Sequence, residues 1–500
     1  MQSLENSCVS SLYYDSEEIA SDPPLSSTQS GDDLERIQNA VEGISLPIPD
    51  SLIIPHLFIT ARSPKVKYPG PESPGLRVPK PNGAHFYIPQ PAGRSSSPMI
   101  IPCIDSVPLP SRSIPVAQLN DSLNKELTGN TLNTNSNLLE RLMPRERLPF
   151  PIDEDLLRRL SSPIGTHPPI WNELSGSFCQ PPRDFGEAAV CEWLNNIGTT
   201  MGLVFGRQCE RLWWSGSCGG PLVDSSVHRK PDVILLDRNY LDRVSQKGLP
   251  GPEWAFVKAL VVVHQGPNAD SLTDSIKSYM TFLRQPHRRF TISLTFINTE
   301  TGQFTITITD RVGQVRTNTM DLMKSSMDNG LVLLWILAFL MFGRPEDTGL
   351  NPYFEINLNG QVIAIECENR RFEVHERIHA LHSLFGRGTQ VWIVTRNGIK
   401  YIMKDSWVRE DGLHNEVAHL RRMASHEELK DRVPTLICGG DVVINGVNDS
   451  TERYRRVGSH RVHRCIVTSP IGESIISFKS KKEFIRVMMS IIESKLTNSE

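Results

Sequence analysis

The stretch "QVWIVTRNGIKYIMK", residues 390–404, contains the strongest local signal for the fold in this chain. Two runs rich in β-branched and aromatic residues flank Asn397 and Gly398. This pair favours a two-residue type I′ turn, in which both positions need a positive φ, so the stretch predicts a β-hairpin. A two-residue turn also fixes the register of the strands, which places Val391 opposite Lys404.

One face of this hairpin is apolar apart from a single charge. Side chains alternate between the two faces of a strand, so four of them share this face. They are Val391, Ile393, Ile402 and Lys404. An ammonium group on an apolar surface is costly unless it is paired, so we expect an acidic partner for Lys404. The alternative is a lysine at a strand end whose ammonium group reaches water.

Two glycines precede the first strand of the hairpin. The segment "LFGRGTQVW", residues 384–392, places Gly386 and Gly388 in a loop that leads into the strand. A glycine loop between strands, above an apolar face with one lysine, is how protein kinases hold ATP. The loop backbone covers the phosphates, the apolar face contacts adenine and the lysine binds phosphate oxygens.

The downstream sequence supplies further parts of such a site. The segment "DGLHNEVAHLRRM", residues 411–423, has apolar residues at helical spacing and offers Glu416 as a carboxylate partner for the lysine. The segment "RCIVTSPIGES", residues 464–474, predicts a buried strand that breaks at Pro470 and Gly472. This pattern is typical of the hinge between the two lobes of a kinase.

Several motifs occur in a recognisable order. Near the hairpin they are "LFGRGTQVW", "IMKDSW", "NEVAHL", "VTSPIGESI" and "FKSKKEF"; upstream they are "RKPDVILL", "QPHRRFTISLTF" and "LLWILAFLMFGRPEDTGLNP". With them the chain resembles the fungal-type protein kinase family over roughly the last 320 residues. The resemblance implies ATP-dependent phosphorylation of serine or threonine in proteins, with ATP and Mg²⁺ as cofactors. It does not specify the protein substrate or partner.

The resemblance also implies roles for individual residues. Gly386 and Gly388 would cover the phosphates, Lys404 would bind them, and Glu416 would hold the lysine from a helix. The nucleotide-binding residues implied in this way are Gly386, Gly388, Val391, Ile393, Ile402, Lys404, Glu416, Thr468, Ser469 and Ile471.

The chain departs from the kinase pattern at several points. Val391 stands where a third loop glycine is expected, and Ile402 stands two residues before the lysine, where kinases usually have alanine. No catalytic aspartate motif and no metal-binding Asn or Asp motif follows Lys404 up to Glu500. We therefore expect a catalytically incomplete chain, truncated before the catalytic loop, with no catalytic or metal-binding residue of its own. The alternative is a non-catalytic interaction protein or pseudokinase fragment.

Two other enzyme classes have partial signals. The segment "HERIH" matches H-E-x-x-H, and its apolar neighbours permit the helix that a zinc metalloprotease needs, with His375, Glu376 and His379 in the motif and His382 as a third ligand. The segment "KPDVILLD" is similar to a Pro-Asp strand of Mg²⁺-dependent nucleases. The next strand, "VVVHQG", has no acidic residue, so we expect at most a nuclease-like scaffold without activity.

Strands and helices mix without a regular βαβ rhythm, which predicts the α+β class. We expect a disordered Ser/Pro-rich tail over residues 1–170 and an N-terminal α/β region over 171–375. Residues 376–500 are expected to form a kinase-like small lobe (an antiparallel sheet plus a helix), a hinge and the start of a large lobe.

Composition restricts partners and location. A net charge of −3 gives no basis for nucleic-acid or anionic membrane binding. The apolar run "LVLLWILAFLMF", residues 331–342, is shorter than the ~20 residues of a membrane-spanning helix, so we expect a buried helix. Nine scattered cysteines and the lack of a signal sequence predict reduced thiols in an intracellular protein of the cytoplasm or nucleus.

Overall fold

The computed structural model describes residues 123–125, 127, 131–134, 138–182, 186–216, 222, 231–246, 251–264, 271–297, 302–322, 326–381, 384–410, 415–427, 433–453, 460–472 and 479–496. All of them belong to one compact unit, residues 58–500. Residues 1–122, most of the predicted disordered tail, lie outside the described part of the chain.

The first of two large sheets has the strand order β1-β9-β8-β7-β6-β5-β4, and β10 pairs with β8. Its strands are β1 (Thr131–Thr134), β4 (Arg211–Ser215), β5 (Val233–Asp237), β6 (Ala259–His264), β7 (Thr291–Ile297), β8 (Gln303–Thr309), β9 (Gln314–Thr317) and β10 (Met320–Asp321). The pairs β1–β9 and β6–β7 are parallel and the others antiparallel. The hairpin β7–β8 matches the alternating pattern of its sequence.

Helices cover both faces of this sheet. They are α3 (Leu138–Leu142), α4 (Glu154–Leu160), α5 (Glu187–Val204), α6 (Arg238–Gln246), α7 (Ser271–Arg284) and α8 (Met327–Phe342), with the 3₁₀ turns η1 (Arg145–Arg147), η2 (Trp254–Phe256) and η3 (Pro345–Thr348) and a short hairpin of β2 (Trp171–Asn172) and β3 (Ser177–Phe178). Alternate residues of β5 point to opposite cores: Val233 and Leu235 toward α5 and α8, Ile234 and Leu236 toward α6 and α7. Its continuous apolar run is therefore a strand buried on both faces.

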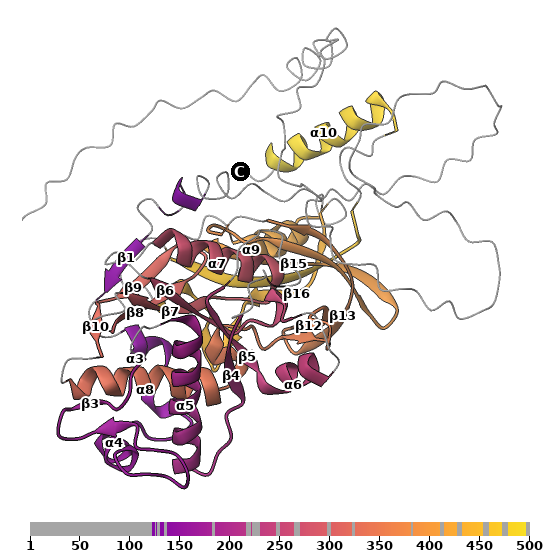
Figure 1. Cartoon of the computed structure of the whole chain (residues 1–500). Coiled ribbons are helices and arrows are strands. Elements are labelled where there is room, and N and C mark those ends of the chain that lie inside the picture. Colours follow the sequence, from indigo (N-terminus) through magenta and orange to yellow (C-terminus); the bar gives the residue numbers. More distant parts are fainter. Residues whose placement is uncertain are drawn as a thin grey trace, which may run out of the picture. The chain divides into compact units, whose positions relative to one another are not determined.

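The predicted buried helix is confirmed as α8. From Leu333 to Phe342 its side chains are at most 8% exposed, and the helix lies against α5 and the first sheet (Figure 1). Among the described residues, no helix combines the length and apolar character needed to cross a bilayer.

The core extends upstream of the predicted boundary at residue 170. Leu138 and Leu142 of α3 and Leu156 and Leu160 of α4 are at most 5% exposed and join the core formed by α5 and α8. These helices have five and seven residues, too short to show a helical period in a serine- and proline-rich sequence. Tertiary packing, together with the Asp153 cap of α4, stabilises them.

The second large sheet is antiparallel, with the order β11-β12-β13-β14-β15-β19-β16. Its strands are β11 (Phe354–Ile356), β12 (Val362–Cys367), β13 (Arg370–Ala380), β14 (Gln390–Arg396), β15 (Ile399–Arg409), β16 (Thr435–Asp441) and β19 (Arg461–Ser469). Nearby lie β17 (Val443–Ile444), β18 (Val447–Asn448), η4 (Thr451–Arg453), α9 (Glu416–Ser425) and α10 (Lys481–Leu496). The hairpin β11–β12 lies within residues 171–375, the range predicted for the upstream region, but it belongs to this sheet. The fold mixes helices and sheets, as predicted.

The central hairpin has the predicted turn and register. Asn397 and Gly398 have φ values of +53° and +75°, and β14 pairs with β15 so that Val391 faces Lys404. Residues 390–404 therefore form a hairpin in the middle of the second sheet.

A buried ionic network joins the two sheets. Arg289, which precedes β7, donates from Nη1 to Asp449 Oδ1 at 2.8 Å. The other oxygen of Asp449 lies 2.9 Å from His463 Nδ1, and His463 Nε2 lies 2.8 Å from Asp405 Oδ1. The imidazole stacks on Trp407 with ring centroids 4.6 Å apart. Asp405, Asp449, His463 and Arg289 are at most 4% exposed.

The network holds His463 in its charged form. Burial alone lowers the pKa of His463, but the two carboxylates outweigh burial and raise the pKa to about 9. Burial likewise raises the pKa of Asp449, but Arg289 and His463 outweigh it and hold the pKa at about 2. A protonated imidazolium between two carboxylates donates two hydrogen bonds, so both ring nitrogens of His463 have an acceptor.

We predict that the network makes stability depend on pH in two windows. His463 binds its proton more tightly in the folded chain, so its contribution is complete below its ordinary pKa of 6.5 and is lost as the pH rises to about 9. Asp449 binds its proton less tightly in the folded chain. Its contribution to stability is therefore complete above its ordinary pKa of 3.8 and is lost as the pH falls to about 2. Thermal unfolding from pH 6 to 9.5 should show a loss of up to about 3 kcal/mol from His463.

The variant His463→Gln should flatten this alkaline loss. The control is His375→Gln, because His375 is exposed on β13 and should leave the pH profile of the wild type unchanged. An alkaline slope that persists in His463→Gln would contradict the assignment.

Candidate nucleotide-binding site

The predicted acidic partner of Lys404 is confirmed. Lys404 Nζ, on the central strand β15, lies 2.5 Å from Glu416 Oε2 at the first residue of α9. The two side chains are 24% and 37% exposed. The Asn415 side chain caps the helix by accepting from the backbone N–H of Ala418 at 3.1 Å, and an acidic residue in the first turn suits the helix dipole.

Apolar packing sets the position of Glu416. Val417 and Leu420 of α9 bury against Ile466 of β19. Ile466 pairs directly with Lys404, so the helix packs on the face of the sheet that carries the lysine. Two buried side chains of α9, and not a flexible loop, therefore hold Glu416 next to Lys404.

The predicted apolar face surrounds the lysine. Val391 and Ile402 are 5% and 6% exposed, and Ile393 is half-buried beside them. Ile402 pairs with Thr468, so the predicted hinge segment begins next to this face. Ser469 ends β19, and Ile471 follows after a cis Ser469–Pro470 bond. The structure thus brings the predicted residues of the sheet, helix and hinge to one region.

The glycine loop joins β13 to β14, as predicted, but its contacts lie in the upstream region. Leu384 is fully buried in the core formed by α6, α7 and η2. The backbone N–H of Gly386 donates to the carbonyl of Arg311 at 2.7 Å. In this arrangement the Gly386 N–H is not available to a phosphate oxygen. The sequence analysis missed both anchors, although the apolar pair before the glycines was a usable signal.

Gly388 has a local packing role. Its φ is +49°, and a Cβ at this position would lie 2.7 Å from Nε of Arg311. The Arg311 side chain also donates to the carbonyl of Leu384 at 3.3 Å. Only glycine allows the loop to lie this close to the arginine.

The zinc-protease interpretation is wrong because its motif does not form a helix. The motif His375–His379 lies in the strand β13, whereas a zinc site of this type needs a helix that places both histidines on one side. His382 lies outside the described residues. Within the described ranges, no group of three or more metal-binding side chains is close enough to hold an ion. Bulges at Val374/Glu376 and Arg377/His379 show how a strand can carry a sequence with helical spacing.

A strand lysine paired with a helix glutamate, on an antiparallel sheet with a glycine loop, is the arrangement of a protein-kinase-like domain. The family model described as fungal protein kinase matches residues 230–460, from just before β5 to just before β19. Over these residues the chain is therefore similar to fungal protein kinases, in agreement with the resemblance seen in the sequence. No curated protein and no solved structure matches the chain.

We predict that Gly388→Ala destabilises the chain more than Gly398→Ala. Both glycines have a positive φ, so both variants acquire strain of about 1 kcal/mol or more. Only Gly388 also has a neighbour in the way, because no atom lies within 4 Å of a Cβ at Gly398. Urea unfolding of both variants measures the difference. Equal losses would show that Arg311 does not constrain the loop.

Proposed function

We propose that the face around Lys404 binds ATP and that the chain acts as a kinase-like nucleotide-binding protein. The observation that carries the proposal is the pair of Lys404 and Glu416, 2.5 Å apart, beside an apolar surface. The family match supports it. Phosphorylation of serine or threonine in a protein is the activity that the family resemblance implies for this site.

The roles of the residues follow from their chemistry. Lys404 would bind phosphate oxygens, and Glu416 would hold the ammonium group in place. Val391, Ile393 and Ile402 would contact the adenine ring, and the backbone from Thr468 to Ile471 would border its edge. Bound ATP would supply the phosphoryl group, with Mg²⁺ offsetting the charge of its phosphates. We assign no catalytic base and no metal ligand to any residue of this chain.

Two features of the site fit ATP, and a third restricts how the glycine loop can contact its phosphates. Lys404 and Glu416 are both partly exposed, so a phosphate can reach the ammonium group. Val391 and Ile402 offer apolar surface at the correct register. The Gly386 N–H is bound to Arg311, so a phosphate contact from this glycine requires that hydrogen bond to open.

We predict that Mg-ATP raises the melting temperature of the full-length chain and that Lys404→Met abolishes most of the shift. A ligand at 100 times its Kd stabilises the folded state by about 2.7 kcal/mol. The matched control is Lys400→Met, because Lys400 is an exposed lysine on the same strand and should keep the full shift. Differential scanning fluorimetry measures all three proteins.

Adenosine separates phosphate binding from base binding. If Lys404 acts on phosphates, Lys404→Met should lose affinity for ATP and keep its affinity for adenosine. The proposal fails if the wild type shows no shift with Mg-ATP, or if Lys404→Met shows the same shift as the wild type. A non-catalytic interaction protein would then be the better interpretation.

A further inference from the structure

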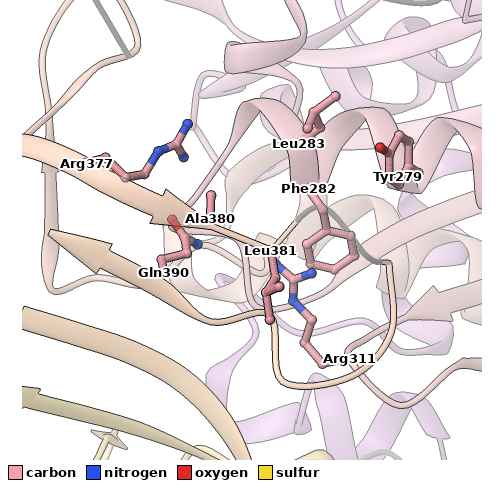
Figure 2. A pocket seen from close by; sticks show the side chains of 8 residues that line it. All are labelled: Tyr279, Phe282, Leu283, Arg311, Arg377, Ala380, Leu381 and Gln390. Carbon is pink, nitrogen blue, oxygen red and sulfur yellow. The ribbon is translucent and has the colours of Figure 1, made fainter. Parts of the chain in front are cut away.

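A small cleft lies between α7 and the strands β13 and β14, where the two sheet regions meet. Figure 2 shows the side chains that line it: Tyr279, Phe282, Leu283, Arg311, Arg377, Ala380, Leu381 and Gln390. It contains about 330 Å³ of empty space, part of which opens to solvent.

Arg377 brings a positive charge to this cleft without an acidic partner. Its guanidinium lies over the Trp392 ring, 5.4 Å from the centroid, and it makes no ion pair with any described residue. Burial lowers the pKa of Arg377, and the nearby positive charge of Arg284 lowers it further. A charge held in this way is costly unless an anion offsets it.

Arg311 places a second guanidinium at the same cleft. It is 4% exposed and lies over the Phe282 ring at 4.3 Å. In Figure 2 Arg377 enters from the strand and Arg311 from the loop between β8 and β9, so the two approach the space from different elements. Arg284, at the end of α7, adds a further positive charge near Arg377. Like charges are brought together here at a cost in stability.

We propose that this cleft binds a phosphate group. Arginine presents planar, forked N–H donors that match phosphate oxygens, and it binds such anions in preference to neutral ligands. The space suits a single phosphate better than a whole nucleotide. The chemistry is that of a phosphate monoester or free phosphate, and the chain's own segment "GRSSSP", residues 93–98, contains serines that could carry one.

This site is separate from the one around Lys404. Trp392, which supports Arg377, alternates along β14 with Val391 and Ile393 and therefore lies on the opposite face of the sheet. The cleft does share Arg311 with the anchor of the glycine loop. A phosphate bound here therefore contacts the residue that holds the loop.

The first test measures the melting temperature of the full-length chain in rising inorganic phosphate, against sodium chloride of equal ionic strength and without nucleotide. We expect phosphate to stabilise the wild type and Arg371→Met. Arg371 lies on the same strand, is half-exposed and pairs with Glu355, so its variant removes the same charge elsewhere. Arg377→Met should need at least about tenfold more phosphate for the same shift, the effect of losing one charge-assisted contact.

Two further measurements keep the result interpretable. Arg377→Lys retains the charge but not the fork, and we expect an intermediate loss of affinity; it also serves as the test if Arg377→Met does not fold. Arg377→Met should keep the Mg-ATP shift, because Arg377 pairs with Trp392 on the face of the sheet opposite Lys404, so that failure of the ATP proposal and failure of this one can be told apart. Phosphate stabilisation that is absent in the wild type, or equal in Arg377→Met and Arg371→Met, would overturn the proposal.

A pair of peptides distinguishes the two sources of phosphate. Residues 91–101 are synthesised with and without phosphoserine and titrated into the chain. Binding of the phosphopeptide more than about tenfold tighter than inorganic phosphate, and dependent on Arg377, identifies a phosphorylated segment as the ligand. Equal affinities identify free phosphate, and both outcomes support the site.

Discussion

The protonated His463 between Asp405 and Asp449 is the interaction on which the arrangement of the two sheets depends. Asp449 also accepts from Arg289, so one buried cluster ties the segment before β7 to the segment between β18 and η4 and to the strands β15 and β19 of the second sheet. Asp405 directly follows Lys404 on β15. Because neighbouring side chains on a strand point to opposite faces, fixing Asp405 in the buried network also fixes the side on which Lys404 emerges. The buried network on one face of the sheet therefore determines that the Lys404 side chain points to the other face, where the candidate nucleotide site lies.

The glycine loop shows a second dependence on the upstream region. In a kinase the loop must lie over the phosphates, and here its residue Leu384 is buried in the core beneath α7 while Arg311 binds the backbone at Gly386. The upstream region therefore supports the glycine loop of the candidate site and is not an independent neighbour. The family match likewise begins at residue 230, well before the glycines.

Local chemistry made part of this structure predictable from the sequence. The Asn397-Gly398 turn fixed the register, and the helical spacing after Asn415 identified Glu416 as the partner of Lys404. Contacts between distant residues left no such signal: Arg289 and Asp449 are 160 residues apart, and Arg311 and Leu384 are 73 apart. The motif at His375 was wrongly predicted to permit a helix, because two bulges in β13 change the period of the strand locally. The short helices before Trp171 had too few turns for a period to appear.

The two charged sites of this sheet differ in a way that bears on function. The network around His463 is fully buried, so its pairs must be complete and it can define geometry. Lys404 and Glu416 are only partly buried, with 24% and 37% of their side chains exposed, so this pair remains accessible to a ligand. This accessibility is what the proposed contact between the ammonium group of Lys404 and a nucleotide phosphate requires.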